Sequence, residues 1–162
     1  MIKIFLLFLI IIFLYLNLKN NIEETFVNYK IDDLILIFST IKNYVIIRHS
    51  VNFPFILPGS DIDILTNELE NNYRKVNNLN LKYFTKKKSF QNKNIKQIDL
   101  YLNNKFYLKL DFTNLLIQPN KEYSLHRALT DNIINNKIKK VENNLEFYIP
   151  NQIDDLGIRY CK

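Results

Sequence analysis

The segment from Pro58 to Leu65 reads Pro-Gly-Ser-Asp-Ile-Asp-Ile-Leu, and it constrains the fold more than any other part of the sequence. A turn-forming Pro-Gly-Ser precedes alternating acidic and aliphatic residues, which is the pattern of a β-strand with one buried face. In such a strand Asp61 and Asp63 point to one face, while the two isoleucines point into a core. Two neighbouring carboxylates can hold Mg²⁺, because hard divalent cations prefer oxygen ligands. The alternative is an ordinary strand whose solvated face carries two acids.

The amino-terminal segment differs in character from the rest of the chain. No charged residue occurs from Ile4 to Leu16, and Lys3 and Lys19 bound this run. We expect residues 1–19 to form a membrane anchor. A full span normally takes about 20 apolar residues, so a signal peptide and a buried core helix stay open as alternatives. No pair of small residues follows for signal-peptidase cleavage, which favours a retained anchor, and the polar residues 20–30 are predicted to be a tether.

Length and charge bound the remaining possibilities. A chain of 162 residues that is 48% hydrophobic can form one domain with its own core, which we place at residues 31–162. The net charge of +6 points to anionic partners such as nucleic acid or acidic lipid. Its lysines gather at 86–88 and 137–140, where a solvated surface is the simpler interpretation. The single cysteine, Cys161, allows no internal disulfide.

The spacing of apolar residues predicts alternating helices and strands in the first half of the domain. Helical spacing begins at Ile31 and is predicted to end near Asn43. Residues 44–48 are typical of a buried strand, and the prolines within 49–58 indicate a loop before the acidic strand. A second helix is predicted over 67–78.

The second half is predicted to be mostly antiparallel strands. Residues 81–116 have strand character, and beyond them we expect a short helix around 123–131, strands around 133–141 and 145–149, and a helix opening near Pro150. The fold class that follows is α/β (α+β), with a mixed β-sheet flanked by helices. Its core is predicted at residues 31–116 and a carboxyl-terminal extension at 117–162.

The last predicted hairpin supplies further carboxylates. If Leu102 pairs with Phe106 across a turn at Asn103-Asn104-Lys105, one face of the hairpin is uniformly apolar. That face comprises Ile98, Leu100, Leu102, Phe106, Leu108, Leu110 and Phe112. A two-residue turn would mix the faces, so a three-residue turn is predicted. Asp99 and Asp111 then lie together on the other face.

These motifs together resemble the nucleotidyltransferase superfamily of the polymerase beta type. In that superfamily a Gly-Ser pair stands about ten residues before a Ser-Asp-h-Asp-h strand, where h is hydrophobic, and a later strand carries a third acid. Here His49-Ser50 stands at that distance before Ser60-Asp61-Ile62-Asp63-Ile64. The resemblance covers about residues 31–116. The strand at 44–48 and the tail from Tyr148 onward also look like minimal, uncharacterised nucleotidyltransferase-like proteins.

The resemblance implies two-metal catalysis of nucleotidyl transfer. Asp61, Asp63 and Asp111 would be the catalytic and metal-binding residues, and would hold two Mg²⁺ ions. Ser50, with the Gly59-Ser60 turn, would bind the triphosphate of an NTP. Arg48 or a lysine of residues 86–88 would add positive charge. The expected reaction moves an NMP from an NTP to a hydroxyl acceptor that the sequence does not identify.

One departure from the family pattern bears on activity. His49 stands where the family has glycine, and its Cβ would hinder close approach of the triphosphate to the backbone. A catalytically inactive, membrane-tethered binding module is therefore an alternative, and a basic protein that binds nucleic acid or lipid is another. Asp99 competes with Asp111 as third carboxylate, and the apolar neighbours of Asp111 favour the latter. We also expect a cytosolic domain, from the supply of NTP, and a partner or second copy that completes the acceptor site.

Overall fold

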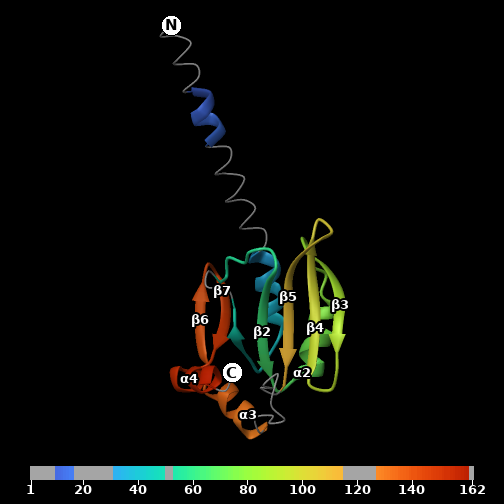
Figure 1. Ribbon diagram of the computed structural model, residues 1–162, viewed down its shortest axis with the longest axis vertical. Coiled ribbons are helices and arrows are strands. Elements are labelled where there is room, and N and C mark those ends of the chain that lie inside the picture. Colours follow the sequence, from blue (N-terminus) through green and yellow to red (C-terminus); the bar gives the residue numbers. More distant parts are fainter. Residues whose placement is uncertain (1–9, 17–30, 50–52, 115–126, 161–162) are drawn as a thin grey trace.

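The computed structural model describes residues 10–16, 31–49, 53–114 and 127–160. After a helix at residues 31–40, strands and helices follow one another in a mixed order (Figure 1). The strands are Tyr44–Arg48 (β1), Ser60–Thr66 (β2), Thr85–Gln91 (β3), Ile95–Leu102 (β4), Lys105–Thr113 (β5), Ile138–Glu142 (β6) and Leu145–Ile149 (β7). The other helices are Leu69–Asn78 (α2), Arg127–Asn135 (α3) and Gln152–Tyr160 (α4).

Five of the strands form one mixed sheet in the order β1-β2-β5-β4-β3. β2 and β5 are parallel neighbours, and the other neighbouring pairs are antiparallel. β6 and β7 form a separate antiparallel pair. The predicted mixed sheet flanked by helices is confirmed. Its central parallel pair brings the Asp-x-Asp strand beside the last strand of the predicted hairpin.

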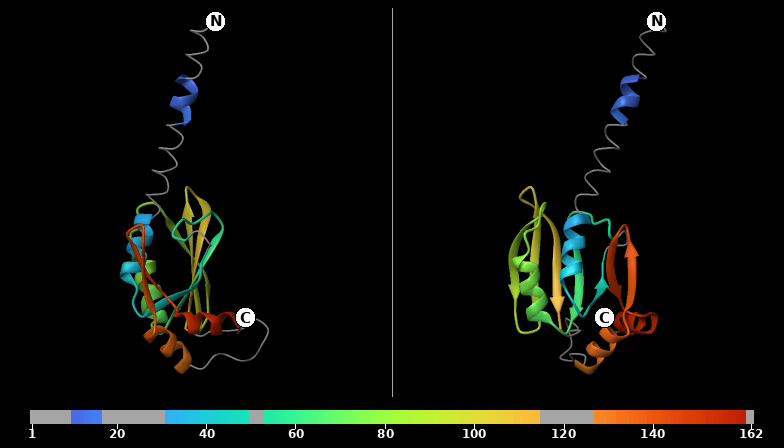
Figure 2. Two further views of the ribbon diagram at one scale, coloured as in Figure 1. Left: turned by 90° about the vertical axis from the view of Figure 1, so that its left-hand side faces the viewer. Right: turned by 180° about the vertical axis from the view of Figure 1, so that it is seen from behind.

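The helix at 31–40 and α2 cover the same face of this sheet (Figure 2, right). Alternate residues of β2 and β5 enter the core beneath them and are fully buried, because a strand turns every second side chain to the same face. These residues are Ile62, Ile64, Leu108, Leu110 and Phe112. Burial of each such side chain contributes about 1.5–3 kcal/mol, so this face holds the sheet together.

The opposite face of the sheet is covered only in part. Val45 and Leu65 on β1 and β2 pack there against Ile133 of α3 and Ile158 of α4. Both helices lie at one end of the sheet (Figure 1). The predicted strand from residue 133 is wrong at its start, because residues 133–135 continue α3 and bury Ile133 against the sheet. The rest of this open face carries the polar residues of β2, β5 and β4.

The β4–β5 hairpin corrects one prediction. Leu102 pairs with Lys105 rather than Phe106, so the turn has two residues, Asn103 and Asn104, both with positive φ. That conformation is the one that two-residue hairpin turns require, and asparagine tolerates it. A bulge follows at Phe106, and it restores the predicted register for Asp99 opposite Lys109 and onward.

The bulge also exchanges two aromatic side chains. Phe106 is exposed and packs against Tyr101, whereas Tyr107 takes its place in the core beside Phe84. The predicted apolar face is therefore wrong at Phe106. It is correct for the remainder of the hairpin, where the alternation of buried and polar residues places Asp99 and Asp111 on the open face.

The predicted anchor at residues 1–19 lies largely outside the described residues, as does the tether at 20–30. Residues 10–16 are helical, and their apolar side chains are exposed. Within the described ranges no helix is both long enough and apolar enough to cross a membrane. The anchor therefore stays a prediction.

Candidate metal and nucleotide site

The three predicted acids come together on the open face of the sheet. Asp61 and Asp63 lie on β2, and the parallel register places Asp63 beside Asp111 of β5. Their side chains share one face because all three alternate with buried apolar residues. Parallel pairing of strands from distant parts of the chain is thus what brings the third carboxylate to the first two.

Two cations link these carboxylates. Arg48 at the end of β1 contacts both oxygens of Asp63, with Nε 2.8 Å from Oδ2 and Nη2 3.2 Å from Oδ1. The same Nη2 lies 3.7 Å from Oδ2 of Asp61. Lys109 of β5 stands between the other two acids, with Nζ 3.5 Å from Oδ1 of Asp61 and 3.5 Å from Oδ2 of Asp111. Acids and bases therefore alternate across β1, β2 and β5.

Asp111 is the acid with the least satisfied carboxylate. Its Oδ2 faces Lys109, while its Oδ1 is buried and has no hydrogen-bond partner. Burial raises the pKa of Asp111; the Lys109 ammonium opposes that shift, and the charges of Asp63 and Asp61 add to it. A buried oxygen without a donor costs about 1–3 kcal/mol, so this lone pair is available for a ligand that the protein itself does not supply.

The pKa of Lys109 reflects both its burial and its two carboxylate neighbours. Burial by itself would lower this pKa, but the carboxylates of Asp111 and Asp61 outweigh it and hold the pKa above its ordinary value. Lys109 therefore stays an ammonium at neutral pH. Its side chain is 28% exposed, so the charge sits in the site rather than in bulk solvent.

Whether these residues fit Mg²⁺ depends on the distances between their carboxylate oxygens, because the ligands of one metal ion must lie close together. Oxygens that share one Mg²⁺ at about 2.1 Å each lie at most about 4.2 Å apart. Among the residues that the structure describes, no three acid, histidine or cysteine side chains are grouped closely enough to hold a metal. Lys109 stands between Asp61 and Asp111, and these two acids would have to move closer to each other to share a metal ion. The donor type and the unpartnered Oδ1 of Asp111 fit Mg²⁺, and the present spacing is that of ion pairs.

Gly59 and Ser60, two of the three residues predicted to bind nucleotide, form the turn at the start of β2. Gly59 has φ +85°, a conformation that favours glycine, and its N–H donates to the carbonyl of Tyr107 at 2.8 Å. The hydroxyl of Ser60 donates to the carbonyl of Leu57 at 2.7 Å, which closes the turn. Ser50 lies outside the described residues. Gly59 and Ser60 thus shape the entry to β2 and set the direction in which Asp61 and Asp63 point.

His49, the departure from the family pattern, stands just after β1. Its ring lies 5.1 Å from that of Phe53, centroid to centroid. Phe53 is a core residue that packs against Phe38 and Phe147. The histidine therefore rests on the aromatic core that supports the loop, which is a structural reason for a ring at this position.

Asp99 occupies a different position from Asp111. It lies on β4 beside Lys109 in the strand register, and its Oδ1 accepts a hydrogen bond from the Ser89 hydroxyl at 3.1 Å. One further strand, β5, separates it from the Asp-x-Asp strand. Asp111, which is paired directly with Asp63, is thus the better placed third carboxylate.

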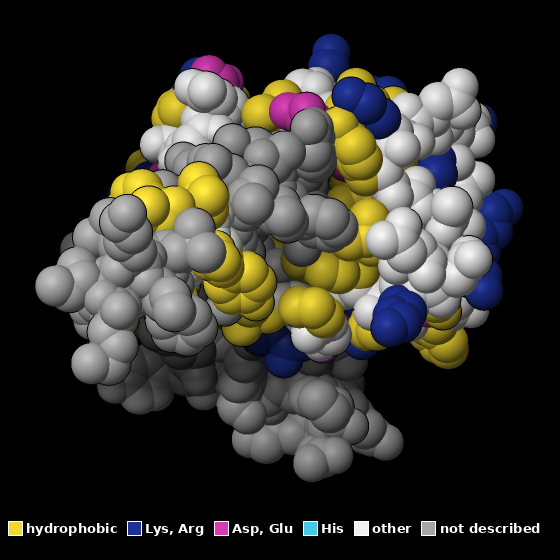
Figure 3. All heavy atoms as spheres, turned by 90° about the horizontal axis from the view of Figure 1, so that it is seen from above, with side chains coloured by type: hydrophobic (Ala, Val, Ile, Leu, Met, Phe, Trp, Pro, Cys, Tyr) yellow, Lys and Arg dark blue, Asp and Glu magenta, His cyan; other side chains and the backbone are white. Residues whose placement is uncertain are grey.

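The lysines of β3 are not gathered at the carboxylates. Figure 3 shows Lys and Arg side chains on the side of the molecule where β3 and β4 lie. Lys86 turns to the helix-covered face and donates to the carbonyls of Val76, Asn77 and Leu79 at the end of α2. Lys87 lies on the open face, 4.5 Å above the ring of Tyr101. Lys86 is therefore a helix-capping residue, which weakens the idea that this cluster binds phosphate or nucleic acid.

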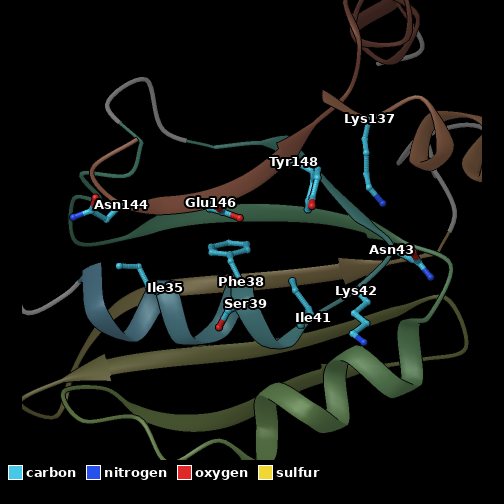
Figure 4. A pocket seen from close by; sticks show the side chains of 10 residues that line it. All are labelled: Ile35, Phe38, Ser39, Ile41, Lys42, Asn43, Lys137, Asn144, Glu146 and Tyr148. Carbon is cyan, nitrogen blue, oxygen red and sulfur yellow. The ribbon is translucent and has the colours of Figure 1, made fainter. Parts of the chain in front are cut away.

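A groove of about 620 Å³ lies elsewhere, between the helix at 31–40 and β7. Ile35, Phe38 and Tyr148 point into it (Figure 4). Glu146 on its wall is paired with Lys139 at 2.8 Å. Because the helix at 31–40 covers the face opposite Asp61, this groove is separate from the carboxylates.

Lys109 is the functional candidate that the sequence interpretation missed. It alternates with Asp111 along β5 as Asp61 alternates with Asp63 along β2. That two-residue spacing alone places Lys109 and Asp111 on one face. Only the parallel pairing of β2 with β5 shows that Asp61 lies opposite Lys109.

Comparison of the chain with protein-family models, curated proteins and solved structures finds no significant match.

Proposed function

We propose that this chain is a Mg²⁺-dependent nucleotidyltransferase that moves an NMP from an NTP to a hydroxyl acceptor. The observation that supports it most is the meeting of Asp61, Asp63 and Asp111 on adjacent strands, with one buried oxygen of Asp111 unpartnered. The sequence resemblance to nucleotidyltransferases supports the same three residues. Three carboxylates on rigid strands suit a reaction that depends on positioning and charge neutralisation.

The residues divide the work by position. Asp61 and Asp63 would hold both metal positions, and Asp111 would complete the one nearer the acceptor hydroxyl. Two bound Mg²⁺ ions would polarise the α-phosphate and offset the charge of the leaving pyrophosphate. Arg48 contacts both carboxylate oxygens of Asp63, which restricts the rotamer of that side chain. The reaction forms a bond from the acceptor oxygen to the α-phosphorus, breaks the bond from that phosphorus to the leaving pyrophosphate, and releases the hydroxyl proton to solvent.

Metal-dependent nucleotide binding tests this function. Each NTP is titrated into the chain by calorimetry with and without Mg²⁺, and the same is done for Asp61→Asn and Asp63→Asn. Asp99→Asn is the matched control, because it removes one carboxylate from the same face of the sheet. We expect binding that needs Mg²⁺, disappears in the first two variants and survives in the control. Binding that is equal in all four proteins would exclude the proposed site.

The second candidate is a nucleotidyltransferase-like binding module without catalysis. The ion pairs of Arg48 and Lys109 favour it, because they already neutralise most of the acidic charge. In that case the folded chain binds neither Mg²⁺ nor NTP, and the Asp61→Asn variant keeps every partner interaction. The titration above therefore distinguishes the two candidates.

For localisation we propose that residues 1–19 anchor the chain to a membrane and leave the domain in the cytosol. The support is the charge-free run from Ile4 to Leu16. Removal of residues 1–19 is expected to move the chain from the membrane fraction to the soluble fraction. An unchanged distribution would contradict the anchor.

A further inference from the structure

The position of Lys109 between two carboxylates suggests the order in which metal and nucleotide bind to the site. We propose that the Lys109 ammonium and Mg²⁺ compete for the space between Asp61 and Asp111, and that the displaced ammonium then binds the triphosphate. This inference rests on the proposed function, because it requires that the three acids bind metal. It adds an order of events: the metal replaces an internal cation, and that cation becomes a ligand for the substrate.

The contact distances identify Lys109, and not Arg48, as the cation that leaves. Ammonium–carboxylate hydrogen bonds are strongest at about 2.7–2.9 Å. Nζ of Lys109 lies 3.5 Å from each of its two carboxylates, so it is shared between them and tightly bonded to neither. Arg48 binds Asp63 at 2.8 Å and 3.2 Å in a two-point contact. Displacing Lys109 therefore costs less than displacing Arg48.

Charge balance favours the same exchange. With all groups ionised, Asp61, Asp63 and Asp111 together with Arg48 and Lys109 carry a net charge of −1. Without Lys109 the remaining four groups carry −2, which one divalent cation neutralises. A metal that entered beside the ammonium would instead meet like charge at short range, at a cost of several kcal/mol at an effective dielectric constant of about 20.

The position of Lys109 also supports the step in which its displaced ammonium binds the triphosphate. Lys109 lies on the open face, in the same register as Asp61 and beside it across the parallel strands. Its four-carbon stem lets the ammonium swing away from the sheet by several ångströms without a change in the backbone. An anion bound to metal at Asp61 and Asp111 would therefore lie within reach of the freed ammonium, and a triphosphate has the charge to hold it.

A methionine substitution tests the exchange, because methionine keeps most of the stem and removes the charge. Mg²⁺ alone is titrated by calorimetry into the complete chain, into Lys109→Met and into Lys87→Met. Lys87→Met is the matched control: it removes an equal charge from the same face, two strands away. We expect Lys109→Met to bind Mg²⁺ about tenfold tighter than the wild type, or more, and the control to match the wild type.

A second titration, with a non-hydrolysable ATP analogue at saturating Mg²⁺, tests the transfer to the triphosphate. Here Lys109→Met is expected to bind about tenfold more weakly than the wild type. Lys109→Gln is measured in parallel, with circular dichroism on each variant, so that a misfolded protein is recognised and the other variant decides.

Each outcome has one meaning. Tighter Mg²⁺ binding with weaker nucleotide binding supports the exchange. Unchanged or weaker Mg²⁺ binding in both Lys109 variants overturns it and leaves the proposed function standing. Tighter Mg²⁺ binding without any loss of nucleotide binding overturns the transfer to the triphosphate. Absence of binding of Mg²⁺ alone in every protein overturns the exchange, and the NTP titrations with and without Mg²⁺ then decide the proposed function separately.

Discussion

Asp33 and Asp111 are both shielded from solvent, but the surroundings of their carboxylates are opposite in kind. Asp33 on the helix at 31–40 is 2% exposed, and its carboxylate accepts hydrogen bonds from three successive backbone N–H groups. These belong to Lys82, Tyr83 and Phe84, at distances of 2.8, 2.8 and 3.0 Å. Asp111 on the open face has one oxygen beside Lys109 and the other without a partner.

The difference separates an acid that serves the fold from the acid that we propose binds a metal ion. All acceptor oxygens of Asp33 have donors, and these hydrogen bonds tie the helix at 31–40 to the segment that leads into β3. Oδ1 of Asp111 has no hydrogen-bond donor, and a metal ion would take the place of that donor. A buried carboxylate with all its acceptor capacity used serves the fold, while one with spare capacity beside other acids is suited to a ligand.

Removal of the Asp33 carboxylate is the strongest test of this comparison. Asp33→Ala leaves three backbone N–H groups without an acceptor and is expected to lower the free energy of unfolding by about 3–5 kcal/mol. Asp33→Asn keeps one acceptor oxygen and should cost about half as much. Urea denaturation followed by circular dichroism measures both. A loss below about 1 kcal/mol for Asp33→Ala would show that Asp33 is not structural.

Asp111→Asn is expected to show the reverse pattern. It removes a buried charge that faces two other acids, so the free energy of unfolding should change by less than about 1 kcal/mol or increase. Mg²⁺ binding should weaken at least about tenfold, because the ligand loses its charge. Denaturation and calorimetry on the same preparation give both values. A large loss of stability with intact metal binding would reverse the assignment of the two aspartates.

A smaller effect is expected from Lys86, which separates structural from solvated lysines. Its ammonium donates to carbonyls at the end of α2, including that of Asn77 at 2.7 Å. Lys86→Met should therefore lower the free energy of unfolding by about 1–2 kcal/mol. Lys88→Met, on an exposed neighbour, is the control and should stay within about 0.5 kcal/mol of the wild type. Equal stability of the two variants would contradict the capping role.

The smallest predicted effect is a dependence of metal binding on pH. Burial raises the pKa of Asp111, so protons compete with Mg²⁺ at a higher pH than for an ordinary aspartate. Mg²⁺ affinity should fall as the pH decreases through that raised pKa. The folded chain takes up this proton more readily than the unfolded chain, so the fold gains stability over the same interval and the loss of metal is not unfolding. Calorimetry across that range checks the trend, and a constant affinity would contradict it.

Much of the fold follows from local pattern. The sequence predicts β1 at its observed residues, the start of β2 at the Gly-Ser turn, and α2 to within two residues. It also predicts that Asp99 and Asp111 share a face, because alternation along β4 and β5 allows only one register with a buried apolar side. These features depend on residues that are close in sequence or on strict two-residue periodicity.

The errors arise where distant residues or local irregularities decide. The two-residue turn with its bulge satisfies both the positive φ of Asn103 and Asn104 and the buried face, a combination that periodicity does not reveal. The hydrogen-bond donors to Asp33 lie about fifty residues away along the chain, which the periodicity of its own helix does not reveal. Lys109 becomes part of the site only through the pairing of β5 with β2.

The number of metal ions that the chain binds together with nucleotide tests the proposed two-metal site. Mn²⁺ is substituted for Mg²⁺, and electron paramagnetic resonance counts the bound ions in the presence of a non-hydrolysable NTP analogue. The proposed site predicts two bound Mn²⁺ ions per wild-type chain, and fewer in Asp111→Asn. No bound Mn²⁺ in the folded wild-type protein, or an equal number in Asp111→Asn, would contradict the proposal that Asp61, Asp63 and Asp111 form a two-metal site.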